Sequence, residues 1–203
     1  MADYYHDLVT DKSWKTLQEL KSQVDFVLIG GWAVYLYTKA LKSKDIDIIV
    51  NFDQLDRLRS QFEVVKNERL KKYEARREEV QIDVYLPHFS EIGVPIEEVV
   101  KRVVSRETFV VPVPEALLIL KQFILGQRGL SAKGQKDRLD ILSILLSVEV
   151  NFREYRKLTQ AWGLTSFPSE LAELVSTTVR IPELSVDEYQ WSKVKKKVLN
   201  LVA

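Results

Sequence analysis

Two short apolar segments, joined through a pair of glycines, constrain the fold of this chain most strongly. Residues 26–29 form the first segment, which ends in Gly30 and Gly31, and the second carries Asp45 and Asp47 among isoleucines. Residues i and i+2 of an extended strand project from the same face, so these two carboxylates would point the same way. The sequence therefore predicts a strand, a glycine turn into a helix, and a second strand with two carboxylates on one face.

A pair of neighbouring carboxylates needs a positive partner. Like charges held side by side repel each other, and burying them is costly. Carboxylate oxygens are ligands that suit Mg²⁺, so a divalent cation is the usual remedy. A glycine turn nearby can also bring backbone N–H groups up to a phosphate. A metal ion and a phosphate together indicate nucleotide chemistry.

A third carboxylate lies on another predicted strand. Residues 80–86 are apolar at every second position, and Asp83 lies at the centre of the opposite, polar face. Three carboxylates on adjacent strands can hold two Mg²⁺ ions about 3.5–4 Å apart. We therefore predict that Asp45, Asp47 and Asp83 are the catalytic residues and the ligands of two Mg²⁺ ions. Asp83 would also accept the proton of the attacking hydroxyl.

Composition excludes several other chemistries. The chain has no cysteine and two histidines, which excludes disulfides and thiolate sites and gives little support to a zinc site or a Ser-His-Asp triad. Its net charge of +1 shows no general preference for nucleic acid or membranes. No apolar stretch reaches the roughly 18 residues that span a bilayer, and the polar, acidic start is unlike a signal peptide. We expect a soluble, cytoplasmic protein that does not bind membranes.

The hydrophobic period changes near Pro114, a residue that suits the first turn of a helix. Helical spacing follows it in residues 115–127, 135–148, 152–162, 168–178 and 185–201. Ser185 and Glu188 form a capping-box pattern for the last of these helices. We predict an α/β domain in residues 1–112 and a helical domain in residues 113–203.

These features, in this order, resemble the nucleotidyltransferase superfamily of the polymerase-β type. The first block consists of Gly30-Gly31, Asp45-x-Asp47 and, on a later strand, Asp83. In the second block a Pro-Glu opens a helix, a lysine follows, and a Lys-Asp-x-x-Asp sequence starts the next helix. Those residues are Pro114-Glu115, Lys121 and Lys136-Asp137-x-x-Asp140. The closer likeness is to small prokaryotic members, including the nucleotidyltransferase toxins of abortive-infection systems, and it covers residues 26–146.

The resemblance implies an α+β fold, with a mixed sheet flanked by helices and then a C-terminal helical region. It also implies an Mg²⁺-dependent transferase that moves a nucleoside monophosphate from an NTP, such as ATP, to a hydroxyl and releases pyrophosphate. In the toxin-like relatives the acceptor is a tRNA end or a protein side chain, so either is expected here. A cognate toxin or antitoxin protein would be a further partner.

The resemblance also assigns roles to residues that bind the nucleotide. Gly30 and Gly31 would face the triphosphate, Lys121 would reach the phosphates as a point charge, and Asp137 and Asp140 would position Lys121 or the nucleotide. This chain departs from the family in one respect. Many active members have serine directly after the first glycine, whereas this chain has a second glycine, so phosphate binding would depend on backbone N–H groups alone.

Other interpretations of the same residues stay open. The two strand carboxylates would also suit a solvated strand face, with Lys44 as a partner. Lys121 would also suit a lysine that extends along its helix to water. Arg128, Lys133 and Lys136 cluster around a glycine-containing loop, which would bind phosphate or nucleic acid, or would simply be solvated. The alternative function is a catalytically inactive protein of this fold that acts as a binding or regulatory partner, for example in a toxin–antitoxin pair.

Overall fold

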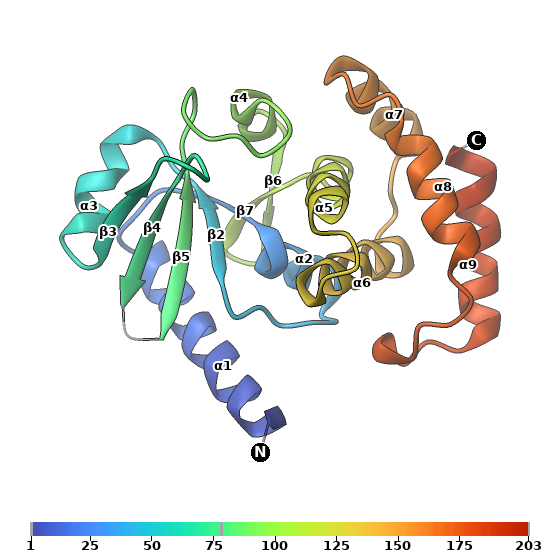
Figure 1. Ribbon diagram of the computed structural model, residues 1–203, viewed down its shortest axis with the longest axis horizontal. Coiled ribbons are helices and arrows are strands. Elements are labelled where there is room, and N and C mark those ends of the chain that lie inside the picture. The colour runs from blue at the N-terminus through green and yellow to red at the C-terminus, as the bar shows by residue number, and fades with distance from the viewer. Residues whose placement is uncertain (1, 78, 203) are drawn as a thin grey trace. The chain divides into compact units, whose positions relative to one another are not determined.

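The computed structural model describes residues 2–77 and 79–202, and the chain divides into two compact units, Met1–Pro112 and Val113–Ala203 (Figure 1). The first unit contains a mixed sheet with helices around it, and the described part of the second unit is helical. The predicted fold class, an α+β fold with a mixed sheet flanked by helices and a C-terminal helical region, is therefore confirmed. Among the described helices, none is both long and apolar enough to cross a bilayer.

The first unit is organised around its sheet. In chain order its elements are α1 (Ala2–Lys21), β1 (Val27–Ile29), α2 (Gly30–Thr38), β2 (Ile46–Ile49), η1 (Phe52–Gln54), α3 (Leu55–Arg59), β3 (Glu63–Asn67), β4 (Lys72–Arg77), β5 (Val80–Tyr85), α4 (Ile96–Val100), β6 (Val103–Arg106) and β7 (Phe109–Pro112). Within the described residues, five strands pair in the order β1-β2-β5-β4-β3. The β2–β5 pair is parallel and the other pairs are antiparallel. The strands β6 and β7 form a separate antiparallel hairpin.

Alternating side chains divide the sheet into an apolar face and a polar face. Ile46 and Ile48 of β2 pair with Ile82 and Val84 of β5, and all four are fully buried. The intervening residues of the two strands are half-buried. A sheet with one face against the core shows this pattern, and α1 contacts β5. The polar side chains of β2 and β5 are therefore gathered on the opposite face.

Aromatic packing holds the start of α2 in place. Trp32 is buried, and its indole N–H donates a hydrogen bond of 2.9 Å to Ser13 Oγ on α1. Its ring lies 4.9 Å from that of Trp14 and meets that of Tyr35 edge-on at 5.4 Å. Such contacts add to the burial of a large apolar area. They anchor the helix whose first residue is Gly30.

The second unit is built from helices joined by short turns. Its elements are α5 (Pro114–Arg128), α6 (Ala132–Ser147), α7 (Phe152–Ala161), α8 (Phe167–Thr177), η2 (Pro182–Leu184) and α9 (Glu188–Val202). A Cβ atom added to Gly134 would lie 2.0 Å from the carbonyl oxygen of Gly129, so α6 begins directly against the end of α5. Ser131 caps α6, because its Oγ accepts a hydrogen bond of 3.1 Å from the N–H of Gly134.

The start of α9 differs from the sequence prediction. The helix begins at Glu188, and the carboxylate of Asp187 accepts a hydrogen bond of 2.8 Å from the N–H of Gln190. Ser185 lies at the end of η2 with a left-handed backbone (φ +51°). The predicted capping box of Ser185 and Glu188 is therefore wrong. An aspartate two residues later supplies the same capping chemistry.

Replacing the observed cap should weaken α9. Asp187→Ala is expected to lower the free energy of unfolding by about 1 kcal/mol, because one N–H of the first turn loses its acceptor. Ser185→Ala is the matched control and should change it by less than about 0.5 kcal/mol. Urea denaturation of the two variants and the parent measures both values. A larger loss in Ser185→Ala than in Asp187→Ala would contradict the observed cap.

Candidate active site

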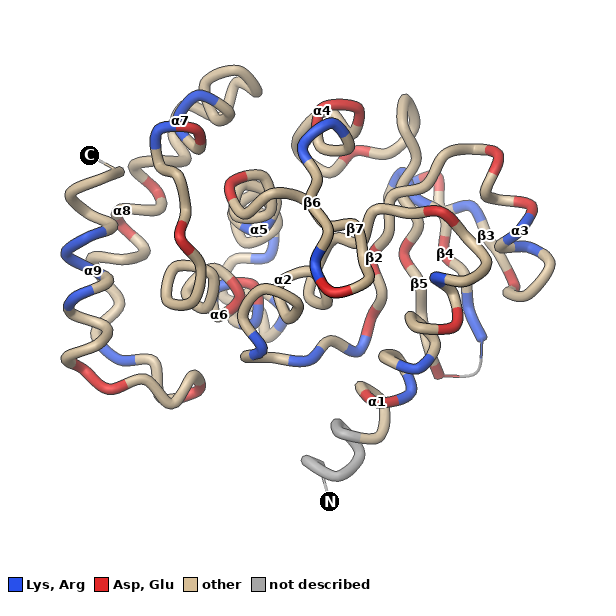
Figure 2. The backbone as a smooth tube through the Cα atoms, turned by 180° about the vertical axis from the view of Figure 1, so that it is seen from behind, with Lys and Arg blue, Asp and Glu red and all other residues tan. Residues whose placement is uncertain are grey.

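Three carboxylates form a row across the three central strands of the sheet. Asp47 of β2 is the register partner of Asp83 of β5, and Asp83 is the register partner of Glu74 of β4. Residues directly opposite each other on neighbouring strands share a face. Figure 2 marks acidic positions on each of these strands. We call Asp47, Asp83 and Glu74 the acidic row.

Sequence reasoning did not include Glu74 among the site residues. The signal was present, because Lys72, Glu74 and Arg76 alternate with Tyr73 and Ala75, which places the charged residues on one face of β4. Sequence reasoning did not pair β4 with β5, although only two residues separate the two strands, and the structure pairs them antiparallel. That neighbourhood brings Glu74 next to a predicted site residue.

Asp45 lies just before the regular part of β2. The strand begins at Ile46, and the backbone carbonyl of Asp45 accepts a hydrogen bond of 3.0 Å from Ser43 Oγ. Both Asp45 and Asp47 are half-buried, so neither lies on a fully solvated strand face. Because Asp45 is outside the strand, the alternation rule sets the direction of Asp47 but not that of Asp45.

Gly30 lies directly against Asp47. A Cβ atom at position 30 would be 2.1 Å from Oδ2 of Asp47, and the glycine has φ +67°, where side chains cause strain. The preceding residue, Ile29, pairs with Asp47 across the β1–β2 ladder. Position 30 therefore needs glycine for two reasons: the positive φ of the turn, and the carboxylate of Asp47, which leaves no space for a side chain.

The same turn opens α2 with backbone groups alone. Gly30 and Gly31 are its first two residues, and within the described part of the chain no side chain caps this helix start. The first N–H groups of a helix have no acceptor inside the helix, and this end carries partial positive charge. An anion is stabilised at such a position. The structure therefore places an anion-favouring helix end next to one end of the acidic row.

Lys72 lies between the other two members of the row. Its ammonium group is 2.5 Å from Oδ2 of Asp83 and 3.6 Å from Oε1 of Glu74. The side chains of these three residues are only 11–15% exposed. The Gln81 amide donates a second hydrogen bond, of 2.8 Å, to Asp83. Sequence reasoning did not identify Lys72 as a site residue.

Glu74 is also held by neighbouring donors. The Asn67 amide donates a hydrogen bond of 2.9 Å to it, and Arg76 lies 3.1 Å away. The hydrogen bond from Asn67, with the charges of Lys72 and Arg76, holds the pKa of Glu74 below its usual value. Glu74 is therefore charged at neutral pH and contributes to the negative potential of this face.

The chemistry of the acidic row suits Mg²⁺, although the described residues do not form a complete metal cluster. All donors are carboxylate oxygens, which Mg²⁺ prefers. Because Gly30 has no side chain, the carboxylate of Asp47 can lie beside the helix start. Among the described residues, however, no group of three or more His, Cys, Asp or Glu side chains is arranged to hold a metal ion. Asp47 and Asp83 are register partners on adjacent strands, and one oxygen of Asp83 is bonded to Lys72.

The second predicted block forms a buried ion-pair network between α5 and α6. Lys121 lies 2.8 Å from Oδ1 of Asp137 and 2.7 Å from Oδ2 of Asp140. At their outer edge, Arg128 lies 2.7 Å from Asp137, and Lys136 lies 3.2 Å from Asp140. We call these five residues the α5–α6 network. Arg128, the last residue of α5, and Lys136, in the second turn of α6, are thus bonded to the same two carboxylates.

Lys121 does not extend to water. Its side chain is 9% exposed, and those of Asp137 and Asp140 are 3% and 0% exposed. Burial alone would lower the pKa of Lys121, but the charges of Asp140 and Asp137 and the hydrogen bonds to both outweigh it. The pKa of Lys121 therefore lies above its ordinary value, and the lysine is charged. The geometry supports the expectation that the two aspartates position Lys121, while its contact with phosphate stays a prediction.

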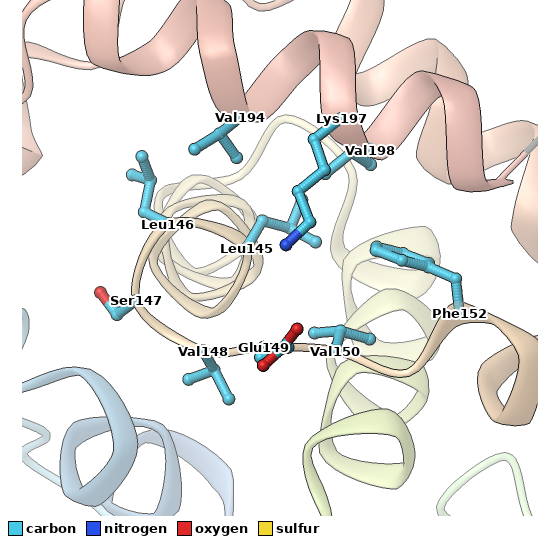
Figure 3. Close-up of a pocket in the computed structure, with 10 residues that line it drawn as sticks. All are labelled: Leu145, Leu146, Ser147, Val148, Glu149, Val150, Phe152, Val194, Lys197 and Val198. Carbon is cyan, nitrogen blue, oxygen red and sulfur yellow. The ribbon is translucent and has the colours of Figure 1, made fainter.

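A separate pocket lies within the second unit (Figure 3). Its volume is about 310 Å³. Its lining residues are Leu145, Leu146, Ser147, Val148, Glu149, Val150, Phe152, Val194, Lys197 and Val198. Lys197 reaches toward its interior from α9. Among the described residues that line it, none is a predicted site residue.

Comparison with known proteins gives likeness at the level of the fold. No family model matches the chain, and no curated protein matches its sequence. The structure is similar to that of JHP933 from Helicobacter pylori, with a TM-score of 0.53 and 13% identity over 95% of this chain and 93% of that chain. It also matches an antigenic nucleotidyltransferase-like protein from Paracoccidioides brasiliensis, with a TM-score of 0.43 and 20% identity over 88% of this chain and 96% of that chain. At these identities only the fold is shared.

A side chain at position 30 should disrupt the helix start. Gly30→Ala is expected to lower the free energy of unfolding by about 2–5 kcal/mol, since it adds backbone strain and a collision with Asp47. Gly163→Ala is the matched control: Gly163 also has a positive φ (+72°), but no described atom lies within 4 Å of its added Cβ. It should lose about 1–2 kcal/mol from strain alone. Equal losses in the two variants, measured by urea denaturation, would contradict the contact between Gly30 and Asp47.

Removing the buried ammonium should destabilise the α5–α6 network. Lys121→Met leaves two buried carboxylates without their central cation and is expected to cost about 3–5 kcal/mol at pH 7. Lys157→Met is the control, because the Lys157–Glu154 pair is exposed; it should cost less than about 1 kcal/mol. Chemical denaturation measures both losses.

The same variant tests the pKa of Lys121. Its folded pKa lies above the ordinary value of 10.5, so the stabilisation should be complete below about pH 10.5 and lost as pH rises through the folded pKa. The difference in stability between parent and Lys121→Met should therefore not shrink as pH rises from 6 to 9, and should shrink only in more alkaline solution. A difference that shrinks between pH 6 and 9 would contradict a charged, carboxylate-bound Lys121.

Proposed function

We propose that this protein is an Mg²⁺-dependent nucleotidyltransferase that moves a nucleoside monophosphate from an NTP to a hydroxyl. The observation that carries the proposal is the parallel register of β2 and β5, which places Asp47 and Asp83 side by side on one face. Gly30, at the start of α2, lies against Asp47. The order of the sequence motifs, from the glycine pair to the second block, supports the same function.

In this proposal Asp47 and Asp83, with Asp45 at the edge of β2, hold the metal. A bound Mg²⁺ neutralises phosphate charge and lowers the pKa of a nucleophile. The N–H groups of Gly30 and Gly31 face the triphosphate, where a helix N-terminus stabilises negative charge. The residues thus position the reactants and stabilise charge, which are the main sources of rate in phosphoryl chemistry.

The proposed reaction forms one bond and breaks another. The oxygen of the acceptor hydroxyl attacks the α-phosphorus of the NTP, and the bond from that phosphorus to the bridging oxygen breaks. Pyrophosphate leaves with the electron pair of that bond. The proton of the hydroxyl passes to a carboxylate, for which Asp83 is the candidate. The acceptor is a tRNA end or a protein side chain, as the sequence resemblance implies, and Lys121, Asp137 and Asp140 stay nucleotide-binding candidates on that basis.

Two observations favour a second candidate function. Lys72 is bonded to Asp83, and no complete metal cluster is found among the described residues. A protein of this fold that has lost catalysis, and acts as a binding or regulatory partner of another protein, would accommodate both findings. Calorimetry separates the two candidates. Mg²⁺-dependent NTP binding supports the enzyme, and tight association with a partner protein without NTP binding supports the alternative.

Removal of Asp47 should abolish the activity without unfolding the chain. The purified protein is incubated with Mg²⁺, each labelled NTP in turn, and total cellular RNA or protein as acceptor. Asp47→Asn is expected to lower the rate of transfer at least about a hundredfold, because a charge that acts on the transition state is lost. Asp56→Asn, in the exposed pair with Arg59, is the control and should keep the parent rate. Retained transfer by a folded Asp47→Asn protein would refute the assignment.

A further inference from the structure

We infer that Lys72 is a resident counter-ion of the acidic row, which a divalent cation must displace from Asp83 in order to bind. Lys72 would thereby set the metal affinity of the site. This inference rests on the proposed metal-dependent function and goes beyond it, since the sequence motifs do not include Lys72. It concerns a positioning residue that acts through Asp83 rather than on the nucleotide.

The geometry shows why the ammonium belongs to the row. Lys72 is in β4, two residues before Glu74, and its side chain runs along the polar face of the sheet to Asp83 on the neighbouring strand. Its 2.5 Å contact with Asp83 is charge-assisted, which makes it a strong hydrogen bond. With 11% of the side chain exposed, the pair is only weakly screened by salt.

Electrostatics requires a cation at this position. Asp47, Asp83 and Glu74 are consecutive register partners, so three negative charges lie on adjacent strands. In the antiparallel β4–β5 pair, residues directly opposite each other have Cβ atoms about 4.5–5.5 Å apart, a distance at which like charges repel. Lys72 offsets the repulsion between Asp83 and Glu74, and a divalent ion would offset the repulsion between Asp83 and Asp47. An ion that binds through Oδ2 of Asp83 would lie beside the ammonium, and the two positive charges would repel each other, so we expect the ammonium and the ion to compete for this oxygen.

Competition predicts that removal of Lys72 strengthens metal binding. The change frees one oxygen of Asp83 and deletes a positive charge a few ångströms from the ion. Even with the dielectric constant of water, that charge alone changes the binding constant of a divalent ion by about tenfold. A lysine that instead contacts a nucleotide phosphate would leave the affinity for the bare metal unchanged.

The matched control removes the same charge from the same face of β4. Arg76 lies four residues after Lys72 on the same strand and forms an ion pair with Glu74. Its side chain is 62% exposed, so water and salt screen its charge. Arg76→Met therefore measures how the loss of one positive charge alone changes metal affinity. Lys72→Met measures the same loss together with the loss of the contact to Asp83.

The experiment titrates the full-length protein with Mn²⁺ and follows free Mn²⁺ by electron paramagnetic resonance, without nucleotide. Lys72→Met is expected to lower the Kd for Mn²⁺ at least tenfold, and Arg76→Met less than threefold. Added Mn²⁺ should also raise the Tm of Lys72→Met more than that of the parent. Circular dichroism in EDTA establishes that each variant is folded. If Lys72→Met does not fold, Lys72→Gln, which keeps a hydrogen-bond donor, takes its place with the same expectation.

An unchanged or weaker Mn²⁺ affinity in the Lys72 variants overturns the inference, and so does an equal gain in Arg76→Met or an absence of Mn²⁺ binding in all variants. Because no nucleotide is present, the outcome is independent of the transfer assay. If the parent transfers nucleotide but the Lys72 variants do not bind Mn²⁺ more tightly, only the role of Lys72 is refuted. If the Lys72 variants bind Mn²⁺ more tightly but the parent transfers no nucleotide, the proposed function is refuted and the competition between Lys72 and the ion is still supported.

Discussion

The parallel pairing of β2 with β5 is the interaction on which the proposed site depends. It buries Ile46, Ile48, Ile82 and Val84 on one side of the sheet and aligns Asp47 with Asp83 on the other. A shift of one residue in this register would send the aliphatic side chains to the polar face. The hydrophobic core therefore holds the carboxylates together, although it makes no direct contribution to their chemistry.

The chain uses the same solution to like-charge repulsion in both of its units. In the first, the ammonium of Lys72 lies between Asp83 and Glu74, and in the second, that of Lys121 lies between Asp137 and Asp140. The surroundings differ, because Asp140 is fully buried whereas Asp83 is partly open to water. A buried network of this kind is costly to break, and the pair of Lys72 and Asp83, with 11% and 14% of its side chains exposed, is the more accessible of the two.

Short sequence patterns predicted those features of the fold that depend only on neighbouring residues. Period-two alternation placed Asp83 on the polar face of its strand, and the glycine pair predicted the turn into α2. The pairing of β2 with β5 is not local, so the neighbourhood of Asp47 and Asp83 could not be read from the sequence. The pairing of β4 with β5 is local, because only two residues separate these strands, but sequence reasoning did not use it to place Lys72 and Glu74 beside Asp83. The depth at which Lys121 lies could likewise not be read from the sequence, because it depends on how α5 and α6 pack. The start of α9 was mispredicted because serine and aspartate are both good caps and only the backbone decides between them.

The aromatic cluster at the start of α2 also places a fluorescent side chain, Trp32, close to the proposed anion-binding position. Trp32 is two residues from Gly30, and its ring lies 4.9 Å from that of Trp14. Indole emission responds to the polarity and charge around the ring, so an anion that arrives at the helix start should alter the intrinsic fluorescence. Binding at this end of the sheet can therefore be followed in solution without any attached dye.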